Sequence, residues 1–298
     1  MSLRKFAERN VCRDGAFRFT IMKRAREKTV PGWLGAVLTL GTFAALVWLE
    51  NRRPLRRSVE SKLRRNARNL AMATLGAASV QLAERPIVAP LARWVERRQL
   101  GLLKRVVLPA WLEVPLAIAL LDYTLYLWHV LTHRVPFLWR FHQVHHADLD
   151  MDASTALRFH FGELLISVPW RAAQILTIGV CPFALSLWQT ALLLEILFHH
   201  SNVELPPEIE ARLAKLIVTP RLHGIHHSIV DDEVNSNWSS GLTIWDRLHR
   251  TLRLDVPQDA ITVGVPAFLD PAAVKLGKVI EMPFVEQRDP QFLPPRQG

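Results

Sequence analysis

The segment from Pro31 to Leu49 carries no charged residue across its nineteen positions. A helix that crosses a bilayer needs about 20 apolar residues, so this segment is expected to span a membrane. Residues 1–30 before it form a basic N-terminal segment, and no small-residue cleavage pattern follows the apolar run. We therefore interpret it as an uncleaved first span rather than as a signal peptide.

Further apolar segments predict an all-α integral membrane protein with about four to five membrane-embedded helices. Residues 106–128 form a second strong span despite Glu113 and Asp122. An ionisable group inside a span usually faces protein or a polar cavity. Residues 70–94 contain two charges and a proline near their middle, so three placements are open: crossing the bilayer, re-entering it, or lying in the interface.

Two more apolar segments, residues 164–180 and 183–198, are separated by Cys181 and Pro182. This pattern predicts a tight helical hairpin. Because Arg171 interrupts the first segment, the hairpin is expected to dip into the membrane rather than cross it.

The formal net charge is +10, and half of the residues are hydrophobic. Such a charge points to nucleic acid or to a membrane surface. Residues 50–68 hold eight basic and two acidic residues, but no aromatic residues interleave them as a nucleic-acid stacking surface would require. We therefore predict a solvated loop that faces anionic headgroups, and no nucleic-acid partner.

The two cysteines, Cys12 and Cys181, are far apart and form no CxxC motif, so neither a disulfide framework nor a zinc ribbon is indicated.

The order of the apolar segments predicts the topology. If residues 70–94 and 106–128 both cross the membrane, and residues 164–198 enter it and return, the basic loop and the histidines lie on the same side of the membrane. The expected organisation has four parts: a basic segment (residues 1–30), N-terminal membrane helices with the basic loop (31–105), a histidine-containing domain (106–255) and a Pro-rich tail (256–298).

All twelve histidines lie between His129 and His249. His129 and His133 form an HxxxH motif, and two HxxHH triplets begin at His142 and His223. Residues at i, i+3 and i+4 share one face of a helix, so each motif can direct two or three imidazoles to one point. A lone histidine is more often a surface or core residue, but this pattern predicts a polyhistidine site for two adjacent metals. Imidazole favours iron, zinc, copper or nickel.

Asp122 precedes His129 by two helical turns and is expected to share its face. It either orients a histidine ligand or forms a hydrogen bond that packs two helices together.

Taken in order, five stretches resemble the bacterial branch of the membrane-bound fatty acid hydroxylase/sterol desaturase superfamily. They cover roughly residues 105 to 255 and read DYTLYLWHVLTHR, VPFLWRFHQVHHADLDMDASTALRFHFGE, LFHHSNVELP, TPRLHGIHHS and NSNWSSGLTIWDRLHRTLR. The ordered set is specific, whereas any single motif is weak. Phe161 replaces a usual proline, and His249 stands where the family often has Phe.

The resemblance implies a membrane-embedded helical fold with a dinuclear non-haem metal centre, normally di-iron, that activates O2. His160, Glu163 and Asn202 are implied as residues that line the site, in addition to Asp122. Which of His199 and His200 binds a metal in the HSN motif stays open. The implied ligand set is His129, His133, His142, His145, His146, His200, His223, His226 and His227.

The activity implied is O2-dependent hydroxylation or desaturation of a C–H bond in a lipid substrate at two iron ions. The metal found in the isolated protein is open between iron and zinc. The sequence has no GxGxxG motif and no cysteine cluster, so an external donor is expected: a ferredoxin, a cytochrome or a reductase. The alternatives are a membrane zinc hydrolase, a metal transporter and a non-catalytic metal-binding protein. The expected location is the bacterial inner membrane, with the histidines facing the cytoplasm.

Overall fold

The structure is a computed structural model that describes residues 28–289 and 291–296. The described residues form helices and only isolated β-bridges, which confirms the expected all-α class. Most of the basic segment predicted for residues 1–30, including Cys12, lies outside the described residues.

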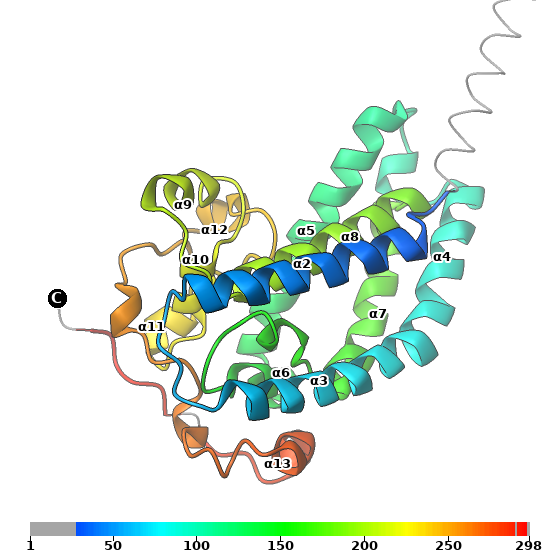
Figure 1. Cartoon of the computed structure of the whole chain (residues 1–298). Coiled ribbons are helices and arrows are strands. Elements are labelled where there is room, and N and C mark those ends of the chain that lie inside the picture. Colours follow the sequence, from blue (N-terminus) through cyan, green and yellow to red (C-terminus); the bar gives the residue numbers. More distant parts are fainter. Residues whose placement is uncertain (1–27, 290, 297–298) are drawn as a thin grey trace, which may run out of the picture.

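Among the described residues, three helices are long and apolar enough to cross a membrane: α2 (Gly32–Arg52), α5 (Ala110–Arg134) and α8 (Pro182–His200). Helix α8 packs against both α2 and α5, and Figure 1 shows α2 and α8 running side by side. Helix α2 leaves large apolar side chains such as Trp33 and Trp48 exposed, as a helix that faces lipid does. The larger predicted number of membrane-embedded helices stays a prediction for the remaining segments.

Residues 70–94, for which three placements were open, belong to one long arc in Figure 1. Helix α3 (Lys62–Ser79) continues through a π-helical turn (Val80–Glu84) into α4 (Arg85–Arg98). Pro86 lies in the first turn of α4 and has no N–H to donate. A single wide turn of this kind lets a helix continue past such an interruption, and it often marks a functional position.

The predicted tight hairpin of residues 164–198 is wrong. Helix α7 (Phe161–Ile178) packs mainly against α4 and α3, whereas α8 packs against α2, α5 and α10 (Pro220–His226). The two helices diverge from the turn at Gly179, whose φ of 85° is a left-handed conformation that glycine adopts readily. The sequence marks this turn, but tertiary packing decides the angle between the helices.

Only Val135 separates the end of α5 from the start of α6 (Pro136–His146), and the two helices pack together, so the second histidine segment folds back beside the first. Figure 1 shows three short helices at the left of the molecule: α9 (Pro207–Leu213), α11 (Asp231–Val234) and α12 (Ile244–His249). The predicted Pro-rich tail includes α13 (Leu276–Glu281). It packs Phe268 and Val279 against Val144 of α6 and Met72 of α3.

The prediction of a solvated loop at residues 50–68 is wrong for its second half. These residues enter α3, where Arg65 is 1% exposed and forms ion pairs with Asp148, at 3.0 Å, and with Asp152. Arg68 pairs with Asp148 at 3.1 Å. The acidic residues after the first HxxHH triplet are the partners, because a buried guanidinium requires compensating charge.

Candidate metal centre

Four helices carry the histidines to one place. Helix α5 supplies the HxxxH pair, α6 the first triplet, α8 the pair at its carboxyl end and α10 the second triplet. The basic loop meets the same end of the bundle, since the Leu55 amide donates to the Asn202 carbonyl at 2.9 Å.

The imidazoles form two clusters in which one ring nitrogen per residue lies within 4.8 Å of the others. Each HxxHH triplet divides between the clusters, so neither cluster belongs to one helix. The first cluster contains His129, His133, His142, His146 and His226, and the second contains His145, His200, His223 and His227.

Distances between facing nitrogens suit ligands that share an ion. In the second cluster, Nε2 of His200 lies 3.0 Å from Nε2 of His145 and 3.0 Å from Nε2 of His223. In the first, Nε2 of His226 lies 3.1 Å from Nε2 of His129. Two imidazoles bound to one metal at about 2.0–2.1 Å place their nitrogens about 3 Å apart.

The outward nitrogens of several rings are fixed by hydrogen bonds. Nδ1 of His129 contacts the Trp238 carbonyl at 2.7 Å, and Nδ1 of His226 contacts the Ser236 carbonyl at 2.8 Å. Nδ1 donates to a carbonyl, which leaves the lone pair of Nε2 pointing into the cluster. Both carbonyls belong to residues 235–240, a Ser/Asn-rich turn (NSNWSS) whose supporting role the sequence alone did not reveal.

Burial keeps the rings neutral. It lowers the pKa of His226 to about 3 and lowers the pKa of His145, His146 and His227 well below its ordinary value. Neutral imidazole is the form that binds a metal. Both ring nitrogens of His146 are buried without a hydrogen-bond partner among the described residues. Buried nitrogens without a partner occur in six of the nine clustered rings: His133, His142, His145, His146, His223 and His227. Such nitrogens in converging rings fit two adjacent transition-metal ions.

Glu163 lies beside this centre, with Oε1 2.9 Å from Nδ1 of His142. His199 lines the adjacent cavity, and its ring centroid is 4.1 Å from that of His223, but it belongs to neither cluster. His249 stacks on Tyr126 at 4.9 Å, away from both clusters.

The structure places His160 and Asp122 outside both clusters, and for Asp122 its contacts favour the second of the two alternatives, a packing hydrogen bond. His160 caps α7, accepting from the Gly162 amide at 2.9 Å. Asp122 accepts from the Leu242 amide at 3.0 Å and from Trp245 Nε1 at 2.7 Å. No hydrogen bond between Asp122 and a histidine occurs in the described ranges, so it packs helices rather than orienting a ligand.

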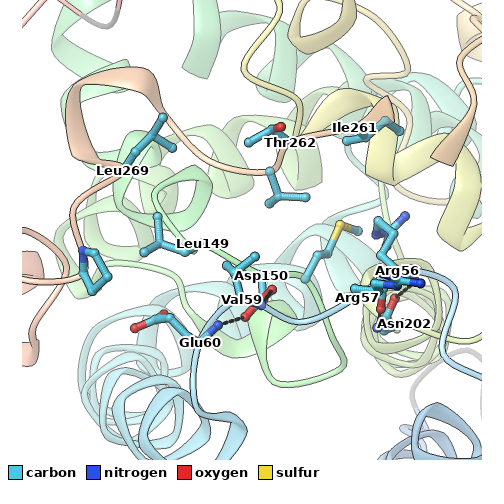
Figure 2. A pocket seen from close by; sticks show the side chains of 13 residues that line it. Arg56, Arg57, Val59, Glu60, Leu149, Asp150, Asn202, Ile261, Thr262 and Leu269 are labelled. Atoms are coloured by element: carbon cyan, nitrogen blue, oxygen red, sulfur yellow. Dashed lines mark hydrogen bonds between the residues drawn. The ribbon is translucent and has the colours of Figure 1, made fainter. Parts of the chain in front are cut away.

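Asn202 lies beside a hollow of about 340 Å³ among the loops that follow the histidine segments (Figure 2). Its Oδ1 accepts from the Arg56 amide at 2.9 Å and its Nδ2 donates to the Arg56 carbonyl at 2.8 Å. Asp150 likewise accepts from the amides of Val59 and Glu60, each at 2.8 Å. Asn202 therefore fixes the basic loop and is not part of either cluster.

An apolar cavity of about 380 Å³ adjoins the histidines and extends between α3, α5, α7 and α8. Its histidine end includes His129, His145, His200 and His223, and its wall is largely aliphatic and aromatic. The divergence of α7 from α8 leaves room for it. The arrangement can bring an apolar molecule against a metal centre while excluding water.

Residues 114–251 match the family described as fatty acid hydroxylase. The chain is 32% identical over 158 residues to the ornithine lipid hydroxylase of Rhizobium tropici, covering 53% of this chain and 46% of that protein. It is 30% identical over 131 residues to the alkylglycerol monooxygenase of Xenopus tropicalis, covering 44% and 28%. The cholesterol 25-hydroxylase of Rattus norvegicus is 24% identical over 160 residues, covering 53% and 52%.

The match thus spans about half, or less, of the length of these curated relatives. No solved structure matches the chain. The matched region and the helical fold define an integral membrane protein with a fatty acid hydroxylase domain. Residues 114–251, a little under half of the chain, are therefore similar to members of the fatty acid hydroxylase/sterol desaturase superfamily.

Proposed function

We propose that this protein is an O2-dependent lipid hydroxylase whose two histidine clusters hold two iron ions. One observation carries the proposal: two clusters of buried imidazoles adjoin an apolar cavity. The balanced reaction is R–H + O2 + two electrons + two protons → R–OH + H2O. Bound iron would supply the activation of O2.

The protein's own residues perform the remaining tasks. The nine clustered histidines would hold the metals, and Glu163 would orient the His142 ring through its Nδ1. The aliphatic wall of the cavity would position an apolar chain that enters from the bilayer and would keep water from the reacting carbon.

Hydroxylation is favoured over desaturation by the names of the relatives, which are hydroxylases and monooxygenases. Those names also refer to an ornithine lipid, alkylglycerol and cholesterol, which supports a lipid as the substrate class for this chain. Desaturation, in which a double bond forms and two waters leave, is an outcome that product analysis would reveal.

The reaction needs two electrons from outside the substrate. We propose a separate ferredoxin, cytochrome or reductase as the donor, and a bacterial inner-membrane location with the histidine end in the cytoplasm. Turnover of the purified protein with NAD(P)H alone would overturn the proposal of a separate donor.

The first experiment is elemental analysis of the full chain purified in detergent, with Mössbauer spectroscopy after iron loading. About two irons per chain with magnetic coupling is the expected result. Isotopically labelled O2 supplied with a chemical reductant and a lipid extract should place one labelled oxygen atom in a product. One tightly held zinc without iron uptake would instead favour the hydrolase or a non-catalytic protein.

A further inference from the structure

One face of α7 runs along the whole cavity. Glu163, Ser167 and Arg171, spaced by four residues, all line it. Glu163 contacts His142 at one end. Arg171 follows eight residues later, which is about 12 Å along a helix axis. The cavity therefore has a histidine end and an arginine end on the same helix.

Arg171 lies beside the middle of a membrane-spanning helix. The neighbouring Trp170 donates from Nε1 to the Thr124 carbonyl of α5 at 3.3 Å, and Gln174 donates to Thr124 Oγ1 at 2.6 Å. An ionisable residue at such a depth is costly unless it is paired, and it usually marks a functional position.

The partner of Arg171 is Glu84, the last residue of the π-helical turn. Nε of Arg171 lies 3.3 Å from Oε2 of Glu84, and Gln189 donates to Oε1 of Glu84 at 3.4 Å. The guanidinium carbon is 5.9 Å from the ring centroid of Trp188. Glu84 is 5% exposed, whereas the Arg171 side chain is 21% exposed. The pair is thus anchored on the glutamate side and accessible on the arginine side.

The cavity reaches the surface beside this pair. Ala77 and Gln81 line the cavity and are also exposed. Gln81 accepts a hydrogen bond from Arg85 at 2.9 Å, which fixes its amide at the opening. The cavity therefore combines a polar mouth, an apolar wall and a base of histidines.

We propose that Arg171, with Glu84 and Gln81, binds a neutral polar group of an amphiphilic substrate, such as a hydroxyl or an amide. The apolar chain of that substrate then extends from the mouth to the histidines. Glu84 already neutralises Arg171, so an anionic group would add an uncompensated charge in an apolar setting. A hydroxyl can accept from the guanidinium and donate to an amide or carboxylate oxygen.

This inference rests on the proposed function and adds a rule to it: the reacting carbon is selected by its distance from the polar group. The probes are a long-chain primary alcohol, the fatty acid and the alkane of equal carbon number. Binding to the full-length, metal-loaded protein is measured without reductant, by the shift of the thermal midpoint across a concentration series. Product position is then measured by mass spectrometry for alcohols of two chain lengths.

The wild-type protein should bind the alcohol at least tenfold more tightly than the alkane, roughly the contribution of one hydrogen bond to a charged group. The fatty acid should bind less tightly than the alcohol. The oxygen should enter at a fixed number of carbons from the hydroxyl in both alcohols. Equal binding of alcohol and alkane, no binding of any probe, or tighter binding of the acid would overturn the proposal.

The decisive variant is the double substitution R171M/E84Q, because it removes both charges together and leaves no unpaired ion. It should bring the ratio of the affinity for the alcohol to the affinity for the alkane near one, while the metal content is unchanged. The control S167A alters the same cavity face between the two ends and should keep the ratio. An unchanged ratio in the double variant would overturn the proposal. Selective alcohol binding without any hydroxylation would instead contradict the proposed function and leave this site standing.

Discussion

The Oε1 atom of Glu163 lies 2.9 Å from Nδ1 of His142, which fixes the ring so that Nε2 faces the first cluster. Removing such a supporting carboxylate typically lowers metal affinity or activity by about 10–100-fold. We expect Glu163→Ala to do so and Glu163→Gln to do less, because its amide oxygen still accepts from Nδ1. Metal titration of the purified variants checks this, and wild-type affinity in Glu163→Ala would refute the assigned role.

The division of the ligands into two clusters predicts the metal content of single variants. His145→Ala removes a member of the second cluster and His226→Ala a member of the first. Each variant should lose at least about one of two metal equivalents and lose activity, while its membrane insertion is unchanged. His249→Ala is the matched control, since this ring stacks on Tyr126 outside both clusters. Full metal content and activity in His145→Ala or His226→Ala would contradict the ligand assignment.

The ion pairs of Asp148 predict that the folded protein loses stability at acidic pH. Burial alone would raise the pKa of Asp148, but Arg65, Arg158 and Arg68 lower it to about 2, compared with about 3.9 in an unfolded chain. The stabilisation, on the order of 2 to 3 kcal/mol, is fully present above pH ~4 and is lost as the pH falls towards 2.

The Asp148→Asn variant lacks this contribution at every pH. Unfolding followed by tryptophan fluorescence should therefore show a gap in stability between wild type and variant at neutral pH that narrows between pH ~4 and ~2. A gap that stays constant down to pH ~2 would show that the carboxylate charge is not what stabilises this network.

A larger side chain at Gly76 is expected to fill the cavity without altering the metal centre. A Cβ atom at this position would lie 3.1 Å from Cδ1 of Leu164, a residue that also lines the cavity. Gly76→Leu should lower the affinity for a long-chain alcohol at least tenfold, roughly the loss expected from steric exclusion of a few buried methylenes. Ala78→Leu, on the exposed side of the same helix, should leave affinity unchanged. Equal binding by both variants would place the lipid elsewhere.

The spacing of the histidines was informative because helical periodicity is local. The motifs at His129 and His142, read as helix faces, correspond to α5 and α6, and the uncharged run from Pro31 corresponds to α2. The family match lies in the same part of the chain as these motifs. The roles of the individual ligands stay predictions.

The sequence did not reveal which residues distant in the chain contact one another in the folded protein. Nothing local to Asp122 shows that it accepts hydrogen bonds from Leu242 and Trp245 rather than serving His129. Arg65 was placed in solvent because its neighbours are basic, whereas its partners follow His146 in the sequence. The basic and acidic runs are complementary in charge, which is the signal that would have suggested their pairing.

Because each HxxHH triplet contributes to both clusters, a nascent chain that ends before α10 cannot complete either one. His226 and His227, the last ligands to be synthesised, lie after the three described helices that are long and apolar enough to cross a membrane. Metal acquisition would therefore be a late event in biogenesis, after the bundle has been inserted. A shortage of metal during growth should leave an inserted, immature protein rather than one that fails to reach the membrane.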